Sequence, residues 1–407
     1  MVISNPSGKS EYTGQARPLF KIGLRNAVLT LLTLGIYRFW ARSRERRYMW
    51  SAMRPAGMAM EYTGNGLEKF LGFLIAVAFL AVYLGIFQIL LSFAGYAFFE
   101  TDPETGIAVP GLLFSIAPIL LLPFIFYAQY RGRRYVLSRT RWRGIRFGAD
   151  KAAWAYVGQA LKHTLITIVT LGILFPRQVF LLEKFRTDRS YFGTAKFHQF
   201  GDWKILLPVA KHVYIGLGLT LAGRALLGIS AVRAGMADDF SGGFPVGFGL
   251  GGIAITVGYT WLFVGLLIFP VASWRIMAAE KVLGEKIRFK SEVDTATVVV
   301  QQLLGSFAAM TIAMIVAAIL GFIFGLLFSG FGEDAALIAG MALGYLSFFI
   351  LFLVLRLIMV TQPVLREFVS SLTILNPEAL DNIEQREGDD FVEAEGFADA
   401  LDVGAAI

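Results

Sequence analysis

The length of its apolar segments constrains this chain most strongly. A helix needs about 20 mostly apolar residues to cross the hydrocarbon core of a bilayer. Six such stretches occur, at residues 70–94, 109–130, 205–230, 246–271, 303–329 and 336–359. Of the 407 residues, 56% are hydrophobic and 16% are charged, against about 25% charged in soluble proteins. These features predict an all-α polytopic membrane protein with about six transmembrane helices in three hairpins.

The charges between these stretches predict how the chain is oriented. Basic residues crowd the segments 38–47, 131–146, 184–189 and 275–290. The other connections, at 100–104, 236–243 and 330–334, are acidic or neutral. By the positive-inside rule the basic segments are cytoplasmic. The polar segment 1–14 has no signal-like apolar region, so both termini of this multi-pass chain are expected in the cytoplasm.

Two further apolar runs, 27–37 and 164–175, are too short to cross a membrane. Basic segments flank each run on both sides, so a full crossing would place one basic cluster outside. We expect both runs to form short re-entrant or interfacial helices that enter one leaflet and return.

These two runs also reveal an internal repeat. Residues 26–36 align with 163–173 at an offset of 137, which matches Thr33 with Thr170 and Gly35 with Gly172. Short tracts of alternating polar and apolar residues recur at 11–14, 61–64, 144–147, 194–197 and 286–289. Isolated strands of this length are unstable without partners, so we expect them to pair into a small cytoplasmic β-sheet.

The repeat divides the chain into four parts. Residues 1–135 form a first repeat with a strand, a re-entrant segment, a basic segment and a hairpin at 70–130. Residues 136–275 form a second, with the re-entrant segment 164–175 and a hairpin at 205–271. Residues 276–370 form a partial repeat with a hairpin at 303–359.

Residues 371–407 form the fourth part, an acidic tail. From residue 376 onward its only basic residue is Arg386. Acidic segments with few apolar residues stay disordered or fold on a partner. We therefore expect a disordered cytoplasmic tail that can dock a protein partner.

Two stretches resemble a known family. LLTLGIYRFWARSRERRY (31–48) and EYTGNGLEKFLGFLIA (61–76) resemble the YjgN family of bacterial inner-membrane proteins, which has no established activity. The resemblance implies a multi-pass protein of the bacterial inner membrane. Family members typically carry Pro-Trp after the Thr-Leu-Gly-Ile-Tyr core, where this chain has Phe39-Trp40 and, in the second copy, Pro176-Arg177. No role is therefore carried over for that dipeptide.

The repeated Thr-rich elements are the first candidate binding residues. Spacings of three and four place each set on one helical face, and a glycine closes each set. The two sets are Asn26, Thr30, Thr33 and Gly35, and His163, Thr167, Thr170 and Gly172. The ends of helices that stop within a membrane can bind headgroups or ions. Alternatively, the threonines bond to backbone one turn away and the glycines cap the helices.

Arg/Tyr pairs in the basic segments are the second candidates, namely Arg47 with Tyr48 and Arg134 with Tyr135. Arginine beside aromatic rings suits anionic lipid headgroups at a membrane surface, and guanidinium groups can bind a phosphate bidentately. Orientation of the chain and interfacial anchoring explain the same residues. The expected lipid partners are therefore anionic headgroups on the cytoplasmic face.

Several chemistries lack support in the sequence. With no Cys and only three scattered His, we expect no metal site and no cofactor. No GxSxG, HExxH or paired-carboxylate motif occurs, so we expect no enzyme. The basic residues lie beside apolar spans, which favours a lipid surface over nucleic acid.

The function expected from the sequence is binding or transport of a small or lipidic anionic solute, because elements that stop halfway through the membrane recur in transporters. Two alternatives stay open. One is a non-transporting membrane scaffold or envelope factor, and the weaker one is a lipid-processing enzyme. The oligomeric state does not follow from the sequence.

Overall fold

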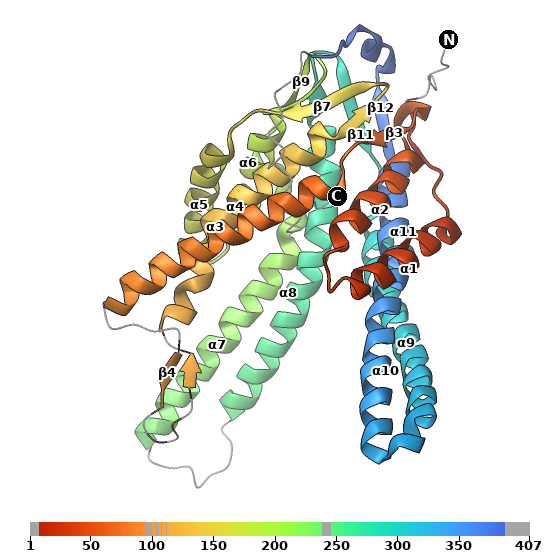
Figure 1. Cartoon of the computed structure of the whole chain (residues 1–407). Coiled ribbons are helices and arrows are strands. Elements are labelled where there is room, and N and C mark those ends of the chain that lie inside the picture. Colours follow the sequence, from red (N-terminus) through yellow and green to blue (C-terminus); the bar gives the residue numbers. More distant parts are fainter. Residues whose placement is uncertain are drawn as a thin grey trace.

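The computed structural model describes residues 8–93, 99–102, 104, 106, 108–110, 112–237 and 246–386. Long helices extend away from a β-sheet that lies at one end of the molecule (Figure 1). The helices are α1 (Ala16–Leu32), α2 (Arg38–Ala52), α3 (Gly66–Phe93), α4 (Leu112–Ser138), α5 (Ala153–Val169), α6 (Phe175–Thr187), α7 (Lys211–Ala237), α8 (Val246–Ala279), α9 (Thr295–Phe328), α10 (Glu333–Arg356) and α11 (Gln362–Ser370).

Five helices in the described part of the chain are long and apolar enough to cross a membrane. They are α3, α7, α8, α9 and α10. The span of α9 continues through a short 3₁₀ turn, and that of α10 continues through a π-helical turn into α11. The expectation of a helical membrane protein is thereby supported. Helix α4 covers another predicted stretch, but it is not among these five.

Helices α7 and α8 form one hairpin, and α9 and α10 form another (Figure 1). Glycines let the backbones approach closely at both crossings, as is common between helices in membranes. A Cβ atom on Gly321 of α9 would lie 2.8 Å from the carbonyl oxygen of Gly340 on α10. A Cβ on Gly223 of α7 would lie 2.8 Å from the carbonyl oxygen of Gly251 on α8. Larger residues would push each pair apart.

The main sheet has eight antiparallel strands in the order β12-β11-β10-β9-β8-β7-β6-β3. Their bounds are β3 (Met60–Tyr62), β6 (Thr140–Trp142), β7 (Ile145–Ala149), β8 (Ser190–Phe192), β9 (Ala195–Gln199), β10 (Lys281–Leu283), β11 (Ile287–Ser291) and β12 (Leu372–Leu375). Each of the hairpins β6–β7, β8–β9 and β10–β11 connects two consecutive helices. Four of the five predicted short tracts therefore pair into one sheet, as expected.

One predicted strand lies outside this sheet. The tract at 11–14 contributes β1 (Glu11–Tyr12), which pairs with β2 (Met53–Arg54) at the end of α2. Just before β1, Lys9 forms an isolated bridge with Thr373 of β12. The amino-terminal segment therefore pairs with β12 through Lys9 and with β2 through β1. A further pair, β4 (Phe99–Thr101) and β5 (Ala108–Pro110), lies between α3 and α4.

The acidic tail begins later in the structure than the sequence predicted. Residues 372–386 contain β12 and a 3₁₀ segment, Pro377–Asn382, rather than a disordered chain. Ile374, Leu380 and Ile383 belong to the buried core of the sheet, with Trp142 and Phe192. Burial of these apolar side chains orders the segment. The rest of the predicted tail, 387–407, lies outside the described residues.

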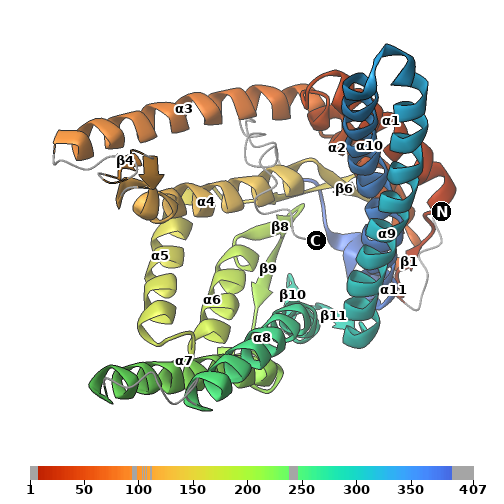
Figure 2. The same ribbon diagram turned by 90° about the horizontal axis from the view of Figure 1, so that it is seen from below.

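The two short apolar runs are the tips of longer helical hairpins, α1–α2 and α5–α6, rather than isolated elements. The first halves of α1 and α5 pack on the protein through buried residues such as Leu19 and Tyr156, so each helix begins well before its apolar run. Both turns use the same backbone geometry, with φ of 50° and 91° at Leu34 and Gly35, and 51° and 86° at Leu171 and Gly172. Figure 2 shows α1–α2 beside α9–α10, and α5–α6 on the opposite side.

Candidate ligand-binding groove between α1 and α2

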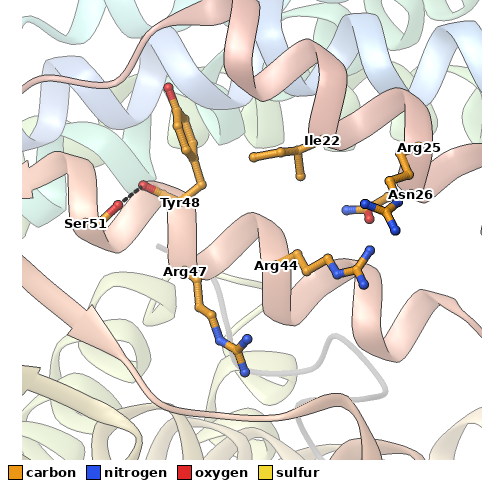
Figure 3. Close-up of a pocket in the computed structure, with 7 residues that line it drawn as sticks. All are labelled: Ile22, Arg25, Asn26, Arg44, Arg47, Tyr48 and Ser51. Atoms are coloured by element: carbon orange, nitrogen blue, oxygen red, sulfur yellow. Dashed lines mark hydrogen bonds between the residues drawn. The ribbon is translucent and has the colours of Figure 1, made fainter.

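A groove of about 400 Å³ lies between α1 and α2. Its lining is rich in arginine and comprises Ile22, Arg25 and Asn26 from α1 and Arg44, Arg47, Tyr48 and Ser51 from α2 (Figure 3). The structure thus brings together three residues predicted from the sequence, Asn26, Arg47 and Tyr48. The α1–α2 turn makes this possible, because it folds two successive helices antiparallel.

Asn26 lies at one end of the groove and is buried, with 2% of its surface exposed. Its Nδ2 donates to the carbonyl oxygen of Ala41 at 3.1 Å and to Oε1 of Glu45 at 3.0 Å. Both acceptors fix the orientation of the amide. Oδ1 consequently points elsewhere and has no hydrogen-bond partner among the described residues. Asn26 therefore joins the two helices and leaves one acceptor unused.

The side chains of Arg25 and Arg44 extend toward the same end of the groove, where Asn26 lies (Figure 3). The guanidinium carbon of Arg44 lies 5.3 Å from the ring centroid of Tyr37. Within the described part of the chain, neither Arg25 nor Arg44 has an acidic partner. Two positive charges are therefore available to an anion here.

Arg47 and Tyr48 are more engaged. Arg47 points away from Arg44 (Figure 3), and its Nη2 donates to the carbonyl oxygen of Gly64 at 3.1 Å. The Tyr48 hydroxyl donates to the carbonyl oxygen of Gln15 and accepts from the Gln15 amide, both at 2.8 Å. These two predicted residues therefore join α2 to the segments that precede α1 and α3.

The groove lies beside the end of an apolar helix. A Cβ on Gly23 would lie 3.2 Å from Leu357 Cδ2 and 3.5 Å from Val354 Cγ1. Those residues flank Arg356, where α10 ends. The groove therefore lies beside the carboxyl-terminal end of α10, where the chain continues through a π-helical turn into α11.

The remaining predicted residues of the first hairpin form its turn. Thr33 Oγ1 donates to the carbonyl oxygen of Leu29 at 2.8 Å and accepts from the Tyr37 amide at 2.9 Å. The amide of Gly35 donates to the carbonyl oxygen of Thr30 at 2.7 Å. The hydroxyl of Thr33 is thus committed to the turn, in agreement with the capping explanation.

The second hairpin repeats this turn. Thr170 Oγ1 donates to the carbonyl oxygen of Ile166 at 2.8 Å and accepts from the Leu174 amide at 3.3 Å. The Gly172 amide donates to the carbonyl oxygen of Thr167 at 2.7 Å. The corresponding donors and acceptors pair at both turns, so the two sequences adopt the same local structure.

The second hairpin does not repeat the arginine groove. At the offset of 137, Lys162 occupies the position of Arg25, whereas Leu181 and Phe185 occupy those of Arg44 and Tyr48. His163 replaces Asn26, and its Nδ1 lies 3.2 Å from Arg177 Nη1. Burial, together with the nearby charges of Arg177 and Lys162, lowers the pKa of His163 below its usual value. The second hairpin therefore keeps one cation of the pair, Lys162, and lacks the counterpart of Arg44.

Arg134 and Tyr135 lie apart from both hairpin turns, on α4. Arg134 is buried, and its Nε donates to the carbonyl oxygen of Ala149 at 3.0 Å. The Tyr135 hydroxyl donates to Glu68 Oε2 at 2.9 Å. These residues connect α4 to β7 and α3, so the structure gives them packing contacts and does not place them in the groove.

Sequence reasoning missed a buried charge cluster around Glu183 of α6. Its carboxylate lies 3.3 Å from Arg133 Nη1, 2.9 Å from Arg186 Nη2 and 2.6 Å from Lys281 Nζ. Burial alone would raise the pKa of Glu183, but Arg133, Lys281 and Arg186 hold it well below its usual value. The basic run around residue 184 indicated chain orientation only, because nothing local links it to Arg133 or Lys281.

The described residues contain no group of three or more acidic or histidine side chains that could hold a metal ion.

The long apolar helices and the arginine groove at their end define a helical membrane protein with a sheet domain on one side. The chain belongs to a family described as "Bacterial protein of unknown function (DUF898)", whose family model matches residues 7–399.

Curated relatives support the same grouping. The chain is 28% identical to inner membrane protein YjgN of Salmonella typhimurium strain LT2 over 149 residues, which cover 36% of this chain and 33% of the relative. It is 28% identical to inner membrane protein YjgN of Escherichia coli strain K12 over 170 residues, or 42% and 38% of the two chains. The matched region spans about a third of the length of these relatives. No solved structure matches the chain.

Proposed function

We propose that this chain is a multi-pass protein of the bacterial inner membrane that binds a phosphate-bearing anion in the α1–α2 groove. The observation that carries the proposal is the pair Arg25 and Arg44, which extend toward one end of the groove without an acidic partner among the described residues. Guanidinium groups match phosphate oxygens with two parallel hydrogen bonds. Binding is the primary activity proposed, and transport of the same anion is one use of it.

The proposed topology has six spans in three hairpins, with α4 as the second span. Contacts between α3 and α4 support their pairing. The Tyr83 hydroxyl donates to the carbonyl oxygen of Leu120 at 3.3 Å, and the rings of Phe79 and Phe124 lie 5.3 Å apart. In this topology the sheet, the groove and both termini are cytoplasmic, because the basic segments that connect the spans lie at the sheet end. The names of the relatives support an inner-membrane location.

The experiment measures anion binding by the full chain in detergent with two probes. Native mass spectrometry counts bound phosphatidylglycerol, and equilibrium dialysis follows radiolabelled glycerol 3-phosphate. The double variant R25Q/R44Q is compared with R17Q/K21Q, which removes two exposed cations from α1 that do not line the groove.

We expect R25Q/R44Q to weaken binding of at least one probe on the order of tenfold, since each basic residue near a lipid surface contributes about 1 kcal/mol. R17Q/K21Q should bind as the natural chain does. Equal binding by all three proteins, for both probes, would refute the groove as the site.

A second candidate function is that of a membrane scaffold. The start of the acidic tail is anchored to the sheet, since the Thr194 amide donates to the carbonyl oxygen of Glu384 at 2.9 Å and Arg143 pairs with Asp381. Such an anchor would present residues 387–407 to a protein partner. Deletion of those residues should then abolish copurification of one defined protein, and an unchanged set of copurifying proteins would rule this function out.

A further inference from the structure

We infer that the ligand of the α1–α2 groove is a diacyl phospholipid that enters from the surrounding leaflet. This inference rests on the proposed function and names the class of ligand for the same site. It draws on three properties of the hairpin, namely its exposed apolar tip, the neutral polar groups of its groove, and its difference from the second hairpin.

The tip of the first hairpin is apolar and exposed. Leu32, Leu34 and Ile36 expose 73%, 95% and 50% of their surfaces. Contact with water costs roughly 25 cal/mol per Å² of such apolar surface. The hydroxyl of Thr33 is satisfied inside the turn. The tip therefore suits contact with hydrocarbon.

The tip and the free arginines are close enough for one lipid molecule to contact both. Leu32 lies seven positions after Arg25 within α1, which corresponds to a rise of about 10 Å. A phospholipid carries its phosphate and its acyl chains within such a distance. A soluble phosphate would contact the arginines alone.

The neutral polar groups of the groove are mostly committed to the protein. The Tyr48 hydroxyl bonds to Gln15, the Ser51 hydroxyl donates to the carbonyl oxygen of Tyr48 at 2.9 Å, and Asn26 Nδ2 has two acceptors. A sugar or polyol needs several free neutral partners, because each polar group left unpaired costs affinity. Charged guanidinium groups are what this groove offers. The groove therefore recognises the phosphate and has few free groups to bind the rest of the headgroup.

The second hairpin shares the apolar tip of the first hairpin but not its pair of arginines. Its tip is equally apolar, with Val169 exposing 74% and Leu171 exposing 63% of their surfaces. Lys162 replaces Arg25 there, but the counterpart of Arg44 is Leu181, so the second hairpin lacks the pair of cations. It therefore provides a matched control for the first hairpin.

The test compares phosphatidylglycerol with glycerol 3-phosphate on the full chain in detergent. Three variants are used: R25Q/R44Q, L32S/L34S at the first tip, and V169S/L171S at the second. The four tip residues are exposed, so serine at these positions leaves the core intact. Native mass spectrometry counts lipid adducts, with an excess of glycerol 3-phosphate as competitor and phosphatidylcholine as a zwitterionic comparison.

We expect phosphatidylglycerol to remain bound against a hundredfold excess of glycerol 3-phosphate. Binding should fall on the order of tenfold in R25Q/R44Q and severalfold in L32S/L34S, but not in V169S/L171S.

If glycerol 3-phosphate displaces the lipid and the Arg variant alone is impaired, the ligand is a soluble phosphate, so the lipid inference fails while the proposed function stands. If the two tip variants lose lipid equally, the tips act as general anchors and the inference is also overturned. If R25Q/R44Q binds both probes normally, the proposed function fails with it.

Discussion

Lys281 Nζ lies 2.6 Å from Oε1 of Glu183, so that the first strand after α8 is joined to the middle of α6. Arg133 of α4 and Arg186 share the same carboxylate. One acidic group thus holds together α4, α6 and the sheet. The next two predictions follow from this arrangement.

Replacing Glu183 with Gln should destabilise the protein strongly. The change would leave three close cations without a counter-charge, which for a buried ion pair costs roughly 3 kcal/mol. Thermal unfolding in detergent, followed by circular dichroism, measures the effect as a lower Tm. Glu292→Gln is the control, because the Lys290–Glu292 pair is exposed and should not change Tm. A Tm equal to that of the natural chain would show that the cluster contributes little.

Acid should weaken the same cluster. Because the pKa of Glu183 is held well below its usual value, the unfolded chain binds a proton here before the folded chain does. The stabilisation is complete above the unfolded pKa of about 4.3 and is lost as the pH falls below it. The Tm difference between the natural chain and Glu183→Gln should therefore shrink between pH 5 and pH 3. A constant difference over that interval would argue against a charged Glu183.

Asn26 to Ala should loosen the first hairpin. The substitution removes one buried and one partly buried hydrogen bond that join α1 to α2, at about 1 kcal/mol each. Burial raises the pKa of Glu45, and the hydrogen bond from Asn26 opposes that rise. The substitution removes this opposing bond as well. Hydrogen exchange of α1 amides should accelerate, while exchange in α5 should not change. Equal protection of α1 in both proteins would show that other contacts hold the hairpin.

Gly35 to Ala should strain the turn without a steric clash. The residue has φ of 91°, which side chains rarely adopt, yet a Cβ there would have no atom within 4 Å. We expect a loss of roughly 1 kcal/mol from backbone strain alone. Gly85→Ala in α3 is a suitable control, since that site is also open but helical and should gain stability. The same Tm shift in both variants would indicate that Gly35 is not needed for its conformation.

Much of the secondary structure could be predicted because it follows from local patterns. Apolar length alone indicated α3 and α7 to α10, since a lipid-facing helix must satisfy its own backbone and expose apolar side chains. The repeat between Thr33 and Thr170 indicated two equivalent turns, and the structure gives both the same hydrogen bonds. Alternating short tracts indicated strands that pair with one another.

Tertiary structure alone decided which distant residues meet. No local pattern shows that β1 pairs with β2 instead of the main sheet, or that Ile374 and Ile383 order the start of the acidic tail. Arg25 joins Arg44 only because the turn folds α1 onto α2. Lys281 meets Glu183 across 98 positions of the chain. Such contacts depend on how whole helices and strands pack, whereas sequence periodicity reports only the environment of each segment by itself.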